Sequence, residues 1–180
     1  MREQLNLTAE DGAAALRDHV ASLASSARQR HGAGLARGEE AAVRALLADP
    51  EVVRFPTALA FDDGPLMAGE FAYAKPRGER PADGYTLCVH PCFAGRWDVV
   101  PLLVAYHVVA INYLDIATNE EAELFGATLL GMSAESYYAR VCELADSIPG
   151  ARPHDPGLAS AFETASSGSC GGSCSCSGGS

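Results

Sequence analysis

Residues 85–115 read YTLCVHPCFAGRWDVVPLLVAYHVVAINYLD, and this stretch organises the fold that we predict. Its first nine residues alternate as a β-strand does, with successive side chains on opposite faces. One face is apolar and predicts the side that meets the core, with Tyr85, Leu87, Val89 and Phe93. The other face carries polar groups and metal ligands, with Thr86, Cys88, His90 and Cys92.

The second half of this stretch predicts a buried helix. Residues 99–114 contain few polar groups, chiefly His107 and Asn112, together with Pro101. A helix that is apolar almost all round is normally buried, because it has no face suited to water. We therefore expect the remaining elements of the domain to pack around this helix.

The chain length and composition predict one domain followed by a tail. Of the 180 residues, 48% are hydrophobic, which is enough for one substantial core. We predict a globular domain over residues 1–150 and a linker over 151–165 that can hold a short helix. The last part, 166–180, is composed mainly of Ser, Gly and Cys. It has almost nothing apolar to bury, so we expect it to be disordered on its own.

The charge balance argues against two classes of partner. Thirteen Lys and Arg residues against 23 Asp and Glu residues give a formal net charge of −10. An acidic surface repels phosphate backbones and anionic lipids, so we expect neither nucleic acid nor membrane as a partner. No apolar run approaches the roughly 20 residues that span a bilayer, and the first residues lack the apolar stretch of a secretory signal. The expected location is the cytoplasm.

The regions before and after the central stretch predict an α+β fold. Thr8 and the alanine-rich residues after it predict a helix over 9–31, which Gly32 and Gly34 would end. A second helix is expected over 38–48. Strand patterns at 57–61 and 67–75 flank a turn-forming segment at 62–65, which predicts a hairpin. With the strand at Tyr85 this makes a small antiparallel three-stranded sheet packed against the buried central helix.

Two further helices are predicted after the central one. Thr118 and Glu121 have the spacing of a capping box, in which each side chain bonds the other residue's backbone amide, so a helix should run over 119–130. Gly131 is expected to end that helix, and Ser133 to cap a last helix that carries Tyr137.

The tail carries the densest group of thiols, at Cys170, Cys174 and Cys176. Thiolates bind zinc, copper(I) and iron–sulfur clusters, and the neighbouring glycines let the backbone wrap closely around such a centre. We expect few structural disulfides in a cytoplasmic protein, so these thiols are candidate ligands for a soft metal ion or a cluster. The alternative interpretation is a flexible tail with adventitious thiols.

A second candidate set comprises Cys88, His90 and Cys92. Their spacing places them on one strand face, so they could converge on one ion. Pro91 would end the strand, and would either release Cys92 toward the site or break the alignment. Cys88 also fits simple core packing, since free cysteine is among the most buried residue types. Our sharpest hypothesis joins the two sets into one composite site completed by the tail.

The order of helices, antiparallel strands, a His-bearing helix and a Glu-bearing helix resembles that of small zincin peptidases. The resemblance rests on His107 and on residues 119–125, NEEAELF, which look like the helix that carries their third ligand. It implies a pocket beside His107. The chain departs from the H-E-x-x-H signature, because Val108 follows His107 and Ile111 takes the place of the second histidine. Metal-assisted hydrolysis is therefore not predicted, and a buried histidine bonded to a carbonyl or carboxylate is the favoured interpretation.

Three classes of function remain open from the sequence. The favoured one is a cytosolic accessory protein for metal or sulfur, such as a maturation factor, that works with a protein partner. The second is a precursor or substrate protein whose tail a modifying enzyme changes, as in ribosomally made peptides. The third is a degenerate zincin-like enzyme or pseudo-enzyme with its site near His107.

Overall fold

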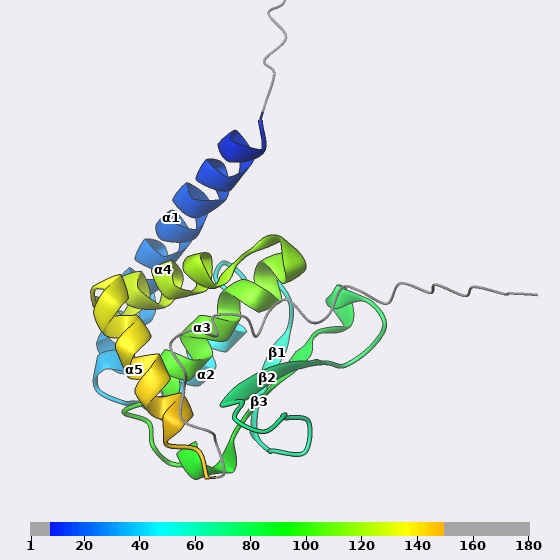
Figure 1. Cartoon of the computed structure of the whole chain (residues 1–180), viewed down its shortest axis with the longest axis vertical. Helices are drawn as coiled ribbons and strands as arrows, with labels where there is room; N and C mark the ends of the chain where they lie inside the picture. The colour runs from blue at the N-terminus through cyan, green and yellow to red at the C-terminus, as the bar shows by residue number, and fades with distance from the viewer. Residues whose placement is uncertain (1–7, 150–180) are drawn as a thin grey trace, which may run out of the picture.

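The computed structural model describes residues 8–149, which form five α-helices and one three-stranded sheet (Figure 1). The central helix α3 (Val100–Tyr113) has Pro101 in its first turn, and most of its residues are buried. Helix α2 (Glu40–Ala48) contacts strand β1, and α3 contacts β2 and β3. Helix α4 (Asn119–Leu130) packs on α3 and α1, and α5 (Ala134–Asp146) packs on α4. The predicted α+β class and the buried central helix are confirmed.

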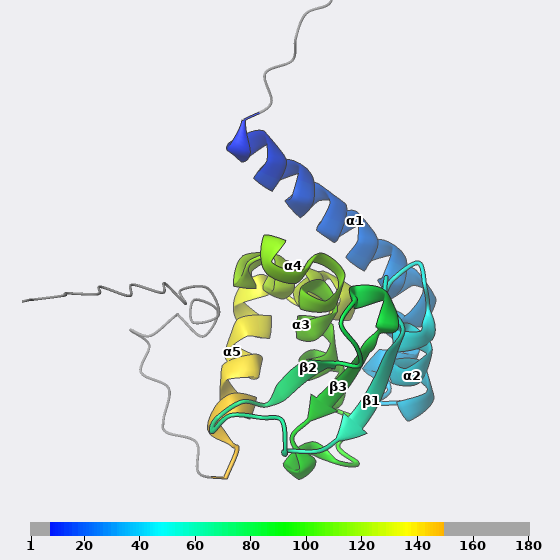
Figure 2. The ribbon, with the colours of Figure 1, turned by 90° about the vertical axis from the view of Figure 1, so that its right-hand side faces the viewer.

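The sheet is mixed, which corrects the prediction of an antiparallel one. Strands β1 (Thr57–Phe61), β2 (Ala72–Pro76) and β3 (Tyr85–Val89) lie in the order β1-β3-β2 (Figure 2). Strand β3 pairs in parallel with β1 and antiparallel with β2. The most completely buried strand therefore takes the central position, where neighbours cover both of its edges.

The predicted hairpin between residues 57–61 and 67–75 is wrong. A turn does form after β1, where the Asp62 side chain accepts a hydrogen bond from Gly64 N at 3.0 Å. The chain then makes a second turn, in which Glu70 N donates to Met67 O at 3.0 Å, so β2 begins only at Ala72. This extra loop carries the chain past the edge of β3, and β2 pairs there instead of beside β1.

Helix α1 (Ala9–Ala36) runs through Gly32 and Gly34, which corrects the predicted end at residue 31. Its start is as predicted, with Thr8 and Asp11 forming a capping box. Gly34 lies against α2, where an added Cβ would come within 2.6 Å of the Ala42 Cβ. The residue in the left-handed conformation after the end of α1 is Gly38, which has a φ of 67°. Gly34 therefore permits the close packing of α1 on α2, and neither Gly32 nor Gly34 ends the helix.

The other helix boundaries follow the sequence closely. The Thr118–Glu121 capping box, the left-handed Gly131 and the Ser133 cap are all present. Three short 3-10 turns complete the described part of the chain, namely η1 (Pro81–Asp83), η2 (Pro91–Phe93) and η3 (Leu114–Ile116). Within residues 8–149 no helix combines the length and the apolar character needed to cross a membrane. The predictions for 151–165 and 166–180 lie outside the described residues.

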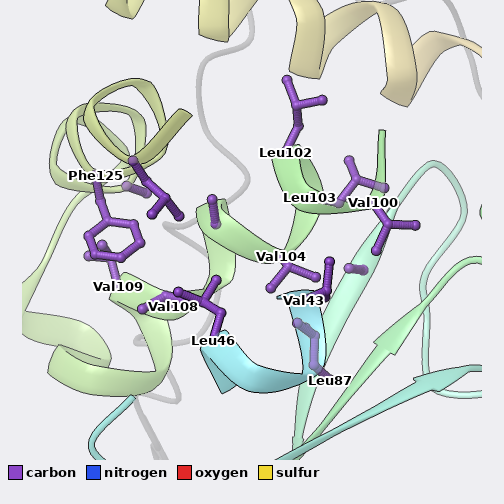
Figure 3. Close-up of a cluster of buried hydrophobic side chains, with 14 of the residues drawn as sticks. Val43, Leu46, Leu87, Val100, Leu102, Leu103, Val104, Val108, Val109 and Phe125 are labelled. Atoms are coloured by element: carbon purple, nitrogen blue, oxygen red, sulfur yellow. The ribbon is translucent and has the colours of Figure 1, made fainter. Parts of the chain in front are cut away.

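The core surrounds α3, with apolar side chains from α2, α4 and the sheet directed toward it (Figure 3). The polar side chain of Asn112 is buried among them, and both its amide nitrogen and its oxygen are hydrogen-bonded. Its amide nitrogen donates to Val52 O at 2.7 Å, and its oxygen accepts from Arg54 N at 2.8 Å. The segment between α2 and β1 is thereby tied to α3, because buried backbone groups need such partners.

Helix α5 is anchored to the core through Tyr137. This side chain is completely buried, and its hydroxyl donates to Leu102 O on α3 at 2.7 Å. The ring lies directly over Gly126 of α4, where a Cβ would overlap the ring atoms. A residue without a side chain at position 126 is therefore required for α5 to reach α3.

We predict that Gly126→Ala lowers the free energy of unfolding by at least about 3 kcal/mol, because the Tyr137 ring must move and lose its hydrogen bond. The matched control is Gly12→Ala on the exposed part of α1, where an added Cβ meets no atom within 4 Å. That change should raise the free energy of unfolding by roughly 0.5–1 kcal/mol through helix propensity. Urea denaturation of both variants checks the prediction, and equal effects would contradict it.

Candidate functional site

Cys88 lies in the middle of the sheet and is inaccessible. It pairs with Ala60 of β1 and Tyr73 of β2, and only 2% of the residue is exposed. Its thiol donates a weak hydrogen bond to Thr86 O at 3.7 Å. Burial raises the pKa of this thiol, the Asp62 carboxylate raises it further, and Lys75 opposes the change. The structure therefore places Cys88 as a packed, protonated thiol.

His90 and Cys92 lie just beyond the end of β3. Pro91 ends the strand and begins the η2 turn, so Cys92 leaves the strand face and is exposed. Phe93 returns to the core from the same turn. Of the two outcomes considered for Pro91, the structure thus shows the strand alignment broken and Cys92 released to the surface. Partial desolvation raises the pKa of its thiol, and Arg96 opposes that shift.

The imidazole of His90 already has a structural role. Its Nδ1 atom accepts a hydrogen bond from Cys92 N at 3.2 Å and so caps the η2 turn. A neutral imidazole has one N–H, so this bond places the proton on Nε2. A metal ion at either ring nitrogen would require the cap to break, since a metal at Nε2 moves the proton to Nδ1. The cost is that of one hydrogen bond, about 0.5–1.5 kcal/mol.

A small open groove of about 180 Å³ lies beside His90. Its lining includes His90, Leu66, Met67, Gly69, Ile148 and Pro149. The groove therefore joins three separate parts of the chain: the loop between β1 and β2, the end of β3, and the last two described residues. Pro149 lines this groove, and residues 150–180 follow it in the sequence.

Met67 is the side chain at this groove that sequence reasoning missed. The sequence placed it on a strand face, whereas the structure places it in a turn with 71% of the residue exposed. The turn is held by two hydrogen bonds, from Met67 N to the Glu70 carboxylate at 2.8 Å and from Glu70 N to Met67 O. A methionine inside a predicted strand carries no local signal for such a position.

The described residues do not complete a metal site by themselves. Within residues 8–149, no group of three His, Cys, Asp or Glu side chains is arranged to hold an ion. Cys88, His90 and Cys92 therefore do not form a sufficient ligand set. Cys170, Cys174 and Cys176 lie outside the described residues, so the composite site stays a prediction. Cys142 is half-buried on α5 and interacts with Tyr138, whose pKa it raises.

His107 joins α3 to β2 and lines neither of the two grooves described for residues 8–149. Its ring nitrogens lie 3.1 Å from Leu103 O and 3.0 Å from Ala72 O. Burial lowers the pKa of this imidazole, although the two carbonyls work in the other direction. The predicted bonding of His107 to a neighbouring carbonyl is confirmed, although the residue is partly and not fully buried.

The glutamates on the helix after His107 have separate roles. Glu121 is buried in the Thr118 capping box, and burial opposes its ionisation, but the hydrogen bonds from Thr118 leave its pKa lowered. Glu120 pairs with Arg17 of α1 at 2.6 Å. Burial raises the pKa of Glu123, which lies near Tyr106. Nothing in these contacts directs a carboxylate toward His107.

A second, larger groove of about 380 Å³ runs along α1 and ends at Glu51. Its side chains are mainly neutral and polar, including Ser22, Ser26 and Gln29. The cation at this groove, Arg30, is paired with Asp49 at 3.3 Å and with Glu51. This groove has none of the soft donors that the sequence singled out.

Comparison with known proteins found no matching protein family, no matching curated protein and no matching solved structure. The functional inference for this chain therefore depends on its own residues.

We predict that His107 makes the protein less stable below about pH 6.5. The folded-state pKa lies below its ordinary value of 6.5, so the unfolded chain binds a proton that the native state does not. Stability is complete above 6.5 and is lost as the pH falls toward the folded pKa, by at most about 1.4 kcal/mol per pH unit.

The measurement is urea unfolding between about pH 8 and about pH 5 for the natural protein and for His107→Gln. The variant keeps an amide donor but does not titrate, so the stability difference between the two proteins should shrink as the pH falls. A difference that is independent of pH would contradict the assignment.

We also predict that iodoacetamide alkylates Cys92 much faster than Cys88 in the native protein. Both thiols have raised pKa values, so accessibility and not acidity decides the order. Peptide mass mapping at timed intervals measures both sites in one sample, and the same reaction in urea is the control, where the two rates should converge. Equal native rates would show that the sheet does not protect Cys88.

Proposed function

We propose that this protein is a cytoplasmic accessory protein that handles a soft metal ion or sulfur for a protein partner. The thiols of Cys170, Cys174 and Cys176 bind the cargo, and the folded body supplies further donors at the end of β3. The observation that supports this proposal is the position of Pro149. It lines the same groove as His90, two residues from the exposed Cys92. The thiol-rich segment is therefore tethered at the corner of the body that carries exposed donors.

The length of chain after Pro149 is compatible with a joint site. Cys170 follows Pro149 by 170 − 149 = 21 positions. At about 3.3 Å per extended residue, these positions reach up to roughly 70 Å, about twice the distance across a domain of this size. Even a compact path therefore allows a tail thiol to meet Cys92. The effective concentration of the tethered thiols at this corner is high, because binding there is intramolecular.

The body donors differ in how readily they can take part. Cys92 is exposed and needs only to lose its proton, which a bound metal ion replaces. His90 must first give up the cap on η2. Cys88 would have to leave its place between β1 and β2, and we assign it no direct contact with the cargo. The proposed ligand set is thus the three tail thiols with Cys92, and His90 as an alternative fourth or fifth donor.

The test is the metal content of the intact protein after purification without chelator. We expect about one equivalent of a soft metal ion, which is lost in a chain that ends at Ala165 and falls at least about tenfold in Cys174→Ser. The matched control is Cys142→Ser, which removes one thiol from α5 and should keep the metal. Circular dichroism on each variant checks that the helices persist.

Two results would contradict the proposal. One is an intact protein that binds no metal or persulfide sulfur, and the other is a chain ending at Ala165 that keeps its metal. Mass spectrometry of material from the native host separates the substrate-protein alternative, since that alternative requires a mass change confined to residues 166–180.

A further inference from the structure

We infer that the groove beside Pro149 is a site for copper(I), with the Met67 thioether and the His90 imidazole as donors from the folded body. This inference rests on the proposed function and names its cargo. It assigns a donor, Met67, that the proposed function does not use. It also selects one ion among the soft metals that thiols alone would accept.

The thioether is held at the surface by the backbone around it. Met67 N donates to the Glu70 carboxylate, and Glu70 N donates back to Met67 O, which closes a tight turn. The preceding residue, Leu66, is bonded in turn to Asp63 O at 3.0 Å. The exposure of Met67 therefore follows from a hydrogen-bonded loop.

The same loop is fixed to the strand that carries His90. Asp62 N donates to Val89 O at 3.0 Å, and His90 N donates to Phe71 O at 2.8 Å, so both ends of the loop are bonded to the end of β3. The third wall is Ile148 and Pro149, of which Ile148 is buried. Met67 and His90 thus line one groove, with Pro149, the last described residue, beside them.

The chemistry of these donors favours a monovalent soft ion. Thioether sulfur is a good ligand for copper(I) and is rarely used for zinc, which takes thiolate, imidazole or carboxylate. Imidazole suits copper as well. The one carboxylate in the lining, Asp63, suits harder ions. A groove built for zinc would not need an exposed methionine.

The state of His90 gives the site a structural signature. Its Nδ1 accepts from Cys92 N, so binding of an ion through either ring nitrogen breaks the cap on η2. Occupation of the groove should therefore change the environment of the Cys92 amide as well as that of the Met67 methyl group. Ion binding at His90 and release of Cys92 are coupled by this one hydrogen bond.

The affinity test uses the full chain under anaerobic, reducing conditions, with copper(I) and zinc each measured by competition with a chromogenic chelator. Met67→Leu should weaken copper(I) binding at least about tenfold and change zinc binding less than about twofold. The substitution is at an exposed position, so the fold should be unaffected. The matched control is Met132→Leu, at a methionine packed against the core, which should leave both affinities unchanged.

A second measurement reports on the site directly. In protein labelled at the methionine methyl groups with carbon-13, one equivalent of copper(I) should shift the Met67 resonance and leave the Met132 resonance in place. His90→Asn keeps an acceptor for Cys92 N in the place of Nδ1 but removes the imidazole. It should weaken copper(I) binding without loss of folding.

The outcomes separate this inference from the proposed function. If Met67→Leu binds copper(I) as the natural protein does, while Cys174→Ser does not bind it, the assignment of copper(I) to the groove is contradicted. The proposed function of the tail thiols is then supported. A Met67 methyl resonance that copper(I) does not move overturns the groove as well. A full chain that binds neither copper(I) nor zinc overturns both.

Discussion

The fold depends on burying a helix that has no polar face. Helix α3 is apolar on all sides, so other elements must cover its whole surface. The sheet and α2 cover part of it, and α4 and α5 cover the rest. Two polar side chains on α3 are bonded inside the protein, Asn112 to the segment before β1 and His107 to the first residue of β2. These bonds fix how the sheet meets the helix, because buried polar groups left unpaired would be costly.

The position of the candidate site follows from this packing. Strand β3 is central because both of its edges are paired, and its end is the point from which the chain must turn back to enter α3. The turn begins at Pro91 and places His90 and Cys92 outside the core. Helix α5 crosses to α3 through Tyr137 over Gly126, and then ends near the same corner. Pro149, the last described residue, thus lies beside His90 as a consequence of how α3 is covered.

Cysteine has two different roles in the described part of this protein. Cys88 is protected by the two strands beside it, and its raised pKa keeps it protonated. Cys92 lies only four positions after Cys88, yet it is exposed because Pro91 ends the strand between them. The alternation of a strand would place both on one face, so the shared face expected from the sequence ends at Pro91. The difference between a packed thiol and an available one is therefore set by where the strand stops.

Most of the local structure could be predicted from the sequence, because it depends on contacts between residues three or four positions apart. The Thr118–Glu121 and Thr8–Asp11 capping boxes are such contacts, and the helices start where they predict. The bonded state of His107 was also predictable, because a polar side chain inside an apolar helix must find a partner. Strand order, the passage of α1 through Gly34 and the groove of Met67, His90 and Pro149 were decided only by the tertiary structure. Each of them depends on contacts between surfaces that are distant in the chain. The spacing of residues in the sequence does not indicate which surfaces come into contact.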